Sequence, residues 1–298
     1  MIFRFDPCGI LCAFFTYLSM IYADYVVINW LVIPSFPQSL WGVFHAVLFN
    51  TVLFFAFVSH ARAMLTDPGL VPVTKNTGKN RRIPERYIDD SDQDNSDESD
   101  VARQAMINTK YVGEDWSVCT RCESFRPPRA HHCRICRRCV RKMDHHCPWV
   151  NNCVGEFNQK FFLQFLLYVG IASFYAILLI VVCWAYHNGV EAQKNPHLQT
   201  IQHTKLLHTI FLSVESVLFG LFVVAVACDQ LQAIFNDETA VEAVQRRGLN
   251  YKYRRRSKMS MMKEVCGSDS LISWFLPCST LPVTKEVVEF PRKSSIEV

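Results

Sequence analysis

Six cysteines and two histidines between residues 119 and 153 recur in a pattern that suits metal binding. The string C-x2-C-x9-H-x6-C begins at Cys119 and returns fourteen residues later at Cys133. Three cysteines and one histidine are typical of a structural zinc site, in which protein atoms fill all four tetrahedral positions. The two predicted sets interleave, so they predict one compact double-zinc unit: Cys119, Cys122, His132 and Cys139 in the first set, and Cys133, Cys136, His146 and Cys153 in the second.

Cys147 is the cysteine of this segment that the repeat leaves without metal partners. The shift of fourteen aligns it with Cys133, which opens a C-x2-C pair, but the residue three positions after Cys147 is not a cysteine. The same shift aligns Asp144 with Ala130, so the second copy gains a carboxylate before its paired histidines and a thiol after them. A thiolate attacks, an imidazole can accept the thiol proton, and a carboxylate can orient the imidazole. We therefore predict Cys147 as nucleophile, His145 as base and Asp144 as the orienting group, with a spare zinc ligand as the alternative interpretation of the thiol.

Long apolar windows on both sides of this segment predict a membrane protein. About 20 apolar residues are needed for a helix to cross the ~30 Å hydrocarbon layer. Half of the 298 residues are apolar and only 19% are charged, which, with these windows, excludes a secreted protein, a disordered protein and a lone soluble domain. The predicted fold class is an α-helical polytopic membrane protein with a small cytosolic double-zinc domain between transmembrane helices two and three. The four expected spans are Cys8–Ile33, Leu40–Val58, Phe161–Tyr186 and Leu206–Cys228.

The distribution of lysine and arginine predicts how the chain is oriented. Pro34–Ser39 has none and His187–Lys205 has two, whereas Ser59–Lys160 has seventeen and the tail from Ala233 has eleven. Cytoplasmic loops carry the excess of positive charge. We therefore expect both termini and the long middle loop in the cytosol, where disulfides are disfavoured. The net charge of +4 then reflects topology and attraction to the lipid bilayer rather than nucleic-acid binding.

The spans also divide the chain into expected domains. Seven of the twelve residues of Asp89–Asp100 are acidic, and such a run cannot bury apolar surface, so it predicts a disordered tether. The expected divisions are residues 1–73 with the first two transmembrane helices, 74–111 as the acidic tether, 112–160 as the zinc domain, 161–233 with the third and fourth transmembrane helices, and 234–298 as a cytosolic C-terminal region.

The segment from Asp144 to Gly155, DHHCPWVNNCVG, resembles the cysteine-rich domain of the DHHC protein S-acyltransferases, or palmitoyltransferases. Asp67-Pro68-Gly69 resembles the family's DPG motif, and the predicted topology matches as well. The residues Asn236-Asp237-Glu238-Thr239 resemble the Golgi-type members. The family's Thr-Thr-x-Glu motif is absent as such, although Asp237–Glu242 can supply its Thr or its Glu, and Phe275-Leu276-Pro277 replaces a C-terminal Asn-Pro.

The resemblance implies a reaction, a location and two binding regions. A fatty acyl group, mainly palmitoyl, would pass from acyl-CoA to Cys147 and then to cysteines of cytosolic-face or membrane-associated proteins in a ping-pong reaction. The Golgi is the expected location, with the endoplasmic reticulum and plasma membrane as alternatives. The CoA head group would meet Arg126, Arg129 and His131, for which a solvated or lipid-facing basic loop is the alternative. The acyl chain would reach Ala172, whose small side chain could instead serve close helix packing.

Two other classes of function remain open on the residues alone. A membrane-anchored RING-like ubiquitin ligase would need the two zinc sites but no nucleophile. A transporter or channel is suggested by Asp24, His45 and Glu215 within the spans. The last residues, Ile296-Glu297-Val298, match the pattern that PDZ domains capture, with an unbound tail as the alternative.

Overall fold

The computed structural model describes residues 6–72, 117–187, 196–245, 256–268 and 270–277. Within these residues, four helical segments are long and apolar enough to cross a membrane, which confirms the predicted spans. The predicted tether at 74–111 and the PDZ-type tail at 296–298 lie outside the described residues. The four segments are Pro7–Ser35, Leu40–Leu65, Gln159–Ala185 and Ile201–Phe235.

The elements follow one another in a helix, strand and helix order. The first two spans are built from α1 (Pro7–Val26), the π-helical turn η1 (Val27–Val32), α2 (Ile33–Ser35) and α3 (Leu40–Leu65). The cysteine-rich segment contains β1 (Ser117–Cys119), β2 (Ser124–Arg126), β3 (His131–Cys133), β4 (Arg138–Val140), β5 (His145–Cys147), the 3₁₀ turn η2 (Pro148–Val150) and β6 (Asn152–Val154). The remaining helices are α5 (Gln159–His187), α6 (Pro196–Phe235), α7 (Ala240–Gln245), α8 (Lys258–Cys266) and α9 (Leu271–Phe275).

The first span begins and bends for local reasons. The side chain of Asp6 caps α1 by accepting a hydrogen bond from the backbone N–H of Cys8, and Pro7 occupies the first helical position, where its missing N–H costs nothing. Near the other end, Pro34 cannot donate to the helical ladder. The π-helical turn η1 ends two residues before this proline, and the span continues to Ser35.

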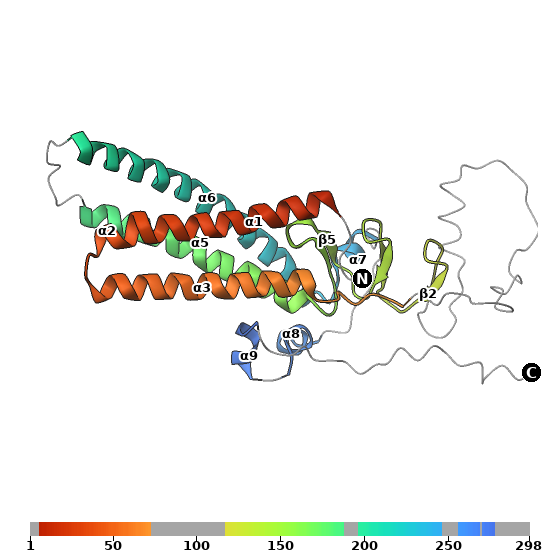
Figure 1. Ribbon diagram of the computed structural model, residues 1–298. Coiled ribbons are helices and arrows are strands. Elements are labelled where there is room, and N and C mark those ends of the chain that lie inside the picture. Colours follow the sequence, from red (N-terminus) through yellow and green to blue (C-terminus); the bar gives the residue numbers. More distant parts are fainter. Residues whose placement is uncertain (1–5, 73–116, 188–195, 246–255, 269, 278–298) are drawn as a thin grey trace, which may run out of the picture.

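The four spans pack into one bundle whose apolar core lies among them. Figure 1 shows α1, α3, α5 and α6 side by side, with the three hairpins gathered at one end and α6 diverging from its neighbours at the other. Phe49, Leu53, Leu179 and Leu212 are buried in the core, while many apolar side chains on the outer faces are exposed. Apolar residues on both the inside and the outside of a helix are expected where lipid is the solvent. At 40 residues, α6 is about 60 Å long and exceeds the hydrocarbon layer.

The cysteine-rich segment consists of three separate antiparallel hairpins, β1–β2, β3–β4 and β5–β6. Each strand has only three residues, too few to bury much apolar surface. The registers place His132 opposite Cys139 and His146 opposite Cys153. Opposite residues of an antiparallel pair lie about 5 Å apart, so each hairpin of this kind brings two predicted metal ligands together.

The hairpins are fixed to the bundle through the end of α3. The carboxylate of Asp67 accepts hydrogen bonds from the backbone N–H groups of Gly69 and Leu70, at 2.8 and 2.7 Å. Gly69 has φ +104°, a conformation that favours glycine, and its carbonyl accepts a hydrogen bond from the N–H of Arg141. The amide of Asn152 donates to three carbonyls at the end of α3. The strands β4 and β6 are therefore held against the second span.

Candidate active site

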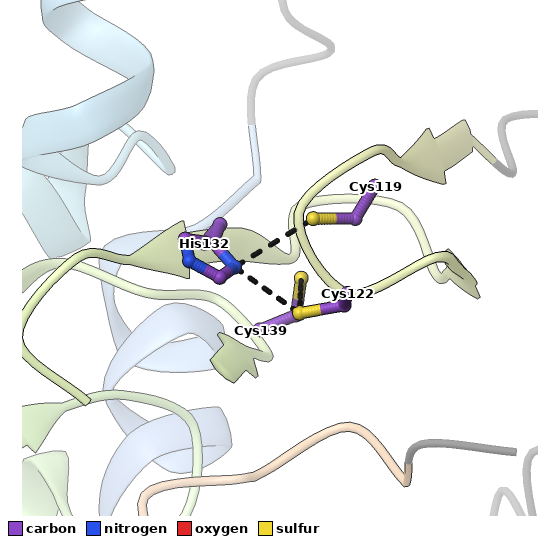
Figure 2. Close-up of side chains that lie close together, drawn as sticks. All are labelled: Cys119, Cys122, His132 and Cys139. Atoms are coloured by element: carbon purple, nitrogen blue, oxygen red, sulfur yellow. Dashed lines mark hydrogen bonds between the residues drawn. The ribbon is translucent and has the colours of Figure 1, made fainter. Parts of the chain in front are cut away.

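The first predicted metal set comes together as the sequence pattern indicates. The ligand atoms of Cys119, Cys122, His132 and Cys139 all lie within 4.8 Å of one another. Figure 2 shows the three sulfur atoms converging on the ring of His132, whose Nδ1 lies 3.6 Å from the Sγ of Cys119 and 3.1 Å from that of Cys122. Three sulfurs and one imidazole nitrogen at this spacing could hold a metal ion, and zinc suits such donors.

The second set adds a residue that the sequence pattern did not reveal. Cys133, Cys136, His146 and Cys153 also lie with their ligand atoms within 4.8 Å of one another. The Nδ1 atom of His146 faces the sulfurs, and its Nε2 lies 3.4 Å from the Oδ2 of Asp6. The two atoms lie within ion-pair distance without forming a hydrogen bond, so Asp6 places a negative charge beside the nitrogen of His146 that points away from the sulfurs. No local pattern links Asp6 to the hairpins, because it acts from the N-terminus of α1.

Asp144 lies directly before the paired histidines and is 2% exposed. Three donors converge on its carboxylate: Nδ1 of His145 at 2.7 Å, Nε2 of Gln230 at 2.7 Å, and the backbone N–H of Ala240 at 2.8 Å. Burial raises the pKa of this carboxyl group, but the hydrogen bonds from His145, Ala240 and Gln230 outweigh burial and hold the pKa below its usual value. The group is therefore a fixed anion supplied with donors by α6 and α7.

His145 connects this anion to the predicted nucleophile. Because its Nδ1 is bonded to Asp144, its Nε2 is the nitrogen that remains for the thiol of Cys147. Burial lowers the pKa of His145, but the hydrogen bonds to Asp144 and Cys147 prevail and raise it to about 9. An imidazole held by a carboxylate beside a thiol is the arrangement of an activated cysteine nucleophile. Cys147 is 6% exposed and belongs to neither metal set.

The turn that follows Cys147 is anchored to the first two spans by His60, another residue that the sequence analysis missed. This histidine is fully buried. Its Nδ1 lies 2.9 Å from the hydroxyl of Tyr17, and its Nε2 lies 2.9 Å from the carbonyl of Trp149. The indole of Trp149 in turn packs against Phe222 of α6. The predicted nucleophile, Cys147, is thus followed by a turn that α1, α3 and α6 hold in place.

The segment after the fourth span forms a reciprocal cap. The Oγ1 of Thr239 accepts a hydrogen bond from the N–H of Glu242, and a carboxylate oxygen of Glu242 accepts from the N–H of Thr239. The register that the sequence left open is therefore Thr-Ala-Val-Glu, with Ala240 at the second position of the family's Thr-Thr-x-Glu motif. This cap aims the N–H of Ala240 at Asp144.

Arg129 belongs to this capping structure. Its guanidinium donates to Oε1 and Oε2 of Glu242, at 2.8 and 3.0 Å, and to Oδ1 of Asp237 at 2.8 Å. A CoA phosphate would have to displace these carboxylates to reach it. Of the other two residues predicted to meet the head group, Arg126 donates through its Nε to the hydroxyl of Ser117, and His131 is half-buried.

The C-terminal helices contact the second and third spans through backbone carbonyls. The carbonyl of Trp274 accepts a hydrogen bond from the amide of Gln164 at 2.8 Å, and that of Phe275 accepts from the hydroxyl of Tyr168. Arg62 donates to the carbonyl of Pro277. Phe275-Leu276-Pro277, the residues that replace the family's Asn-Pro, are thus docked by main-chain groups.

A largely apolar cavity of about 300 Å³ opens beside Cys147 and reaches into the bundle. All four spans line it, with residues such as Met20, Leu53, Ala172 and Phe222. From Phe162 to Ala176 on α5, both in the lining, the helix rises by about 21 Å. A sixteen-carbon chain is roughly 20 Å long, about two thirds of the ~30 Å hydrocarbon layer. The predicted nucleophile and an apolar cavity of acyl-chain length therefore meet at one point.

Comparisons with known proteins agree with this arrangement. The family model described as DHHC palmitoyltransferase matches residues 113–247. The chain is 35% identical to palmitoyltransferase ZDHHC3 of Homo sapiens over 92% of its own length and 82% of the relative. It is 35% identical to palmitoyltransferase ZDHHC7 of Mus musculus over 91% and 79% of the two chains, and 30% identical to probable protein S-acyltransferase 13 of Arabidopsis thaliana over 89% and 81%. These names favour an acyltransferase over the ubiquitin ligase and transporter interpretations.

Proposed function

Because the chain belongs to the DHHC palmitoyltransferase family and is an enzyme of that kind, we propose that it transfers a long-chain acyl group, mainly palmitoyl, from acyl-CoA to Cys147 and then to target proteins. The observation that carries this proposal is the junction of three parts: a thiol outside both metal sets, an imidazole held by a buried carboxylate, and an apolar cavity that begins at the thiol.

In the first half-reaction, the sulfur of Cys147 attacks the thioester carbonyl of acyl-CoA. His145 takes the proton of the thiol and returns it to the CoA sulfur as the C–S bond to CoA breaks. Asp144 remains ionised and stabilises the charged imidazole, as its three donors favour. The acyl chain then lies in the cavity among the spans while its carboxyl carbon is bonded to Cys147.

In the second half-reaction, a cysteine of a cytosolic-face or membrane-associated protein attacks the enzyme thioester. His145 accepts the proton of the incoming thiol and Cys147 is released. The bonds broken and formed are both thioesters, so the transfer needs no other source of energy. Because CoA leaves before the protein substrate reacts, the kinetics should be ping-pong.

We assign two structural zinc ions to the two sets of three cysteines and one histidine. The donor chemistry and the closeness of the four ligand atoms in each set fit zinc. When bound, zinc fixes short hairpins that bury little apolar surface, and so supplies part of the folding free energy of this segment. Neither ion has an open position for catalysis, because four protein ligands fill each set.

We propose that Arg126 and His131, on the hairpin side of the site, bind the head group of CoA. Arg129 instead serves to hold α7, since its donors are bonded to Glu242 and Asp237.

We also propose that the active site faces the cytosol in a Golgi membrane, in line with the positive charge of the middle loop. A PDZ domain as partner for Ile296-Glu297-Val298 remains part of this proposal.

The test is a two-step labelling of the purified enzyme in lipid nanodiscs. Wild type, incubated with an alkynyl palmitoyl-CoA, should acquire a hydroxylamine-sensitive label, and after removal of acyl-CoA it should pass the label to a membrane-bound cysteine substrate. The Cys147→Ser variant should acquire no label at the substituted position under these conditions and transfer none, yet retain two zinc ions by elemental analysis. Loss of a zinc ion in this variant would make Cys147 a ligand, and transfer without a labelled enzyme would refute the ping-pong order.

A further inference from the structure

Glu215 is a carboxyl side chain within the fourth span that has no part in the reaction described so far. It lines the apolar cavity that begins at Cys147. On α6 the lining runs from Val226, which packs against the apolar cluster that contains Cys147, to Glu215. Eleven residues separate the two positions, or about 16 Å of helix. Glu215 therefore lies towards the end of the cavity that is remote from the thiol.

Two serines of the third and fourth spans line the cavity at a similar depth. The amide of Gln159 donates to the side-chain oxygen of Gln230 at 3.4 Å, so these two residues mark one level on α5 and α6. Ser173 and Ser216, both in the lining, each lie fourteen residues, or about 21 Å, beyond that level. They are 8% and 5% exposed, and their hydroxyls have no hydrogen-bond partner within the described part of the chain.

A third serine, Ser19 of α1, completes this polar group. It lines the same cavity and is hydrogen-bonded to the carboxyl group of Glu215. A carboxyl group can take part in more than one hydrogen bond in either protonation state. We call these four residues the distal polar cluster: Ser19, Ser173, Glu215 and Ser216. The hydrogen-bonding capacity of the cluster exceeds the one bond observed within it.

The part of the cavity nearer Cys147 is lined mainly by apolar side chains, such as Phe162, Phe165 and Phe222. A saturated chain on Cys147 is matched by these residues. If sixteen carbons span roughly 20 Å, the distal polar cluster lies beside about carbons 13 to 16. Methylene groups there exclude water from polar groups without offering a hydrogen bond. A hydroxyl group on one of these carbons would supply that bond.

We propose that the enzyme accepts fatty acyl groups that carry a hydroxyl near the far end of the chain, and that Glu215 determines this specificity; this rests on the proposed function. The hydroxyl donates to a carboxyl oxygen of Glu215 and accepts from Ser173 or Ser216. It takes no part in the bonds that form and break, which remain those between the acyl carbon and the sulfurs of Cys147 and CoA. In a wholly apolar cavity the same hydroxyl would lose its hydrogen bonds to water, at a cost of about 5- to 150-fold in affinity.

The experiment compares single-turnover acylation of Cys147 by 16-hydroxyhexadecanoyl-CoA and by hexadecanoyl-CoA, with the full-length enzyme in nanodiscs. The ratio of the two rates cancels any change that affects both chains equally. This ratio should be lower in Glu215→Leu than in wild type by about tenfold or more. Glu215→Gln keeps the hydrogen-bonding capacity, so its ratio should stay within about threefold of wild type. The matched control is Asp24→Leu, which removes another carboxyl group of the spans, one outside the cavity lining, and should leave the ratio unchanged.

The position of the hydroxyl gives a second readout. A hydroxyl on carbon 6 would lie against the apolar part of the cavity, so wild type should acylate slowly with 6-hydroxyhexadecanoyl-CoA, and Glu215→Leu should not change that ratio. Ser173→Ala should lower the 16-hydroxy ratio by about threefold. This variant keeps the proposal testable if Glu215→Leu does not fold, as judged by its zinc content.

Four other outcomes are decisive. Wild type that reacts with hexadecanoyl-CoA but not with the 16-hydroxy chain would overturn the proposal and leave the proposed function intact. Equal 16-hydroxy ratios in wild type and Glu215→Leu would overturn it too, even if the preferred length of unsubstituted chains changed, because the cluster would then only end the cavity. An equal fall of the ratio in Asp24→Leu would assign the effect to packing of the spans and overturn the role of Glu215. Absence of Cys147 acylation by hexadecanoyl-CoA in wild type would instead refute the proposed function.

Discussion

The backbone N–H of Ala240 can be removed without removing any side chain from the active site. Ala240 is the first residue of α7, its side chain is exposed, and its N–H donates to the Oδ1 of Asp144 at 2.8 Å. Proline is well tolerated at the first helical position. Ala240→Pro should therefore preserve the cap formed by Thr239 and Glu242 and delete only this donor.

The size of the effect follows from the charge of the acceptor. A hydrogen bond to a charged group contributes about 1.5–3 kcal/mol, which would correspond to a rate change of about 10- to 150-fold if it were lost entirely in the transition state. Two donors, from His145 and Gln230, remain on the carboxylate of Asp144. We therefore expect a loss near the lower limit, about tenfold, in the rate of acylation of Cys147.

The pH dependence gives a second, independent readout. The pKa of Asp144 is held low in part by the N–H of Ala240, so loss of this donor should raise it. Because the reaction needs ionised Asp144, the acidic limb of the rate profile should move to higher pH in Ala240→Pro. Single-turnover acylation with palmitoyl-CoA from about pH 3, below the usual pKa of an aspartate, to about pH 8 measures both effects. Ala240→Gly, which keeps the N–H, is the control and should resemble wild type, with zinc content unchanged in both. A wild-type rate and pH profile in Ala240→Pro would falsify the role given to this donor.

Three further predictions concern the metals and the cavity. His145→Ala should retain both metal ions and lose acylation of Cys147, whereas His146→Ala should release one ion; equal metal loss in the two variants, measured by elemental analysis, would contradict their separate roles. Asp6→Asn keeps a good cap for α1 but removes the charge facing His146, so chelator competition should show about 10- to 100-fold weaker binding at that set alone, and equal retention at both sets would refute the contact. Ala172→Tyr should shift the preferred acyl-CoA from sixteen or eighteen carbons towards fourteen with zinc content unchanged, and an unchanged preference would place the end of the cavity elsewhere.

Much of the site could be predicted because its chemistry is local in the chain. Zinc ligands must recur at short fixed spacings to reach one ion, so the fourteen-residue repeat identified both sets that the structure brings together. The same repeat isolated Cys147 as the cysteine without partners, and His145 and Asp144 lie two and three residues before it. The spans were equally accessible, since a membrane requires long apolar windows whatever the details of packing.

The groups that control this chemistry could not be predicted in the same way. Asp6, His60, Gln230 and Ala240 act from three different helices and the N-terminus of a fourth, and none belongs to a local pattern. A backbone N–H leaves no trace in a sequence, because every residue except proline has one. For Arg129, in contrast, the residue type suggested a role, and the contacts that bear on that role are distant in the sequence. Its basic side chain suggested a phosphate ligand, but the carboxylates that occupy it come from residues more than a hundred positions away.

The geometry of Cys147 depends on the membrane bundle as much as on the zinc segment. The strand β5 ends at Cys147, β6 returns by Val154, and α5 begins at Gln159, so the thiol is tied by a short connection to the span that lines much of the cavity. The carboxylate behind it is completed by Gln230 of the fourth span and by α7. In the proposed mechanism the hairpins therefore supply the reactive groups, the fourth span and α7 supply partners of Asp144, and the spans supply the space for an acyl chain. In this proposal, catalytic geometry and acyl-chain binding are coupled through α6, because that helix carries both Gln230 and part of the cavity wall.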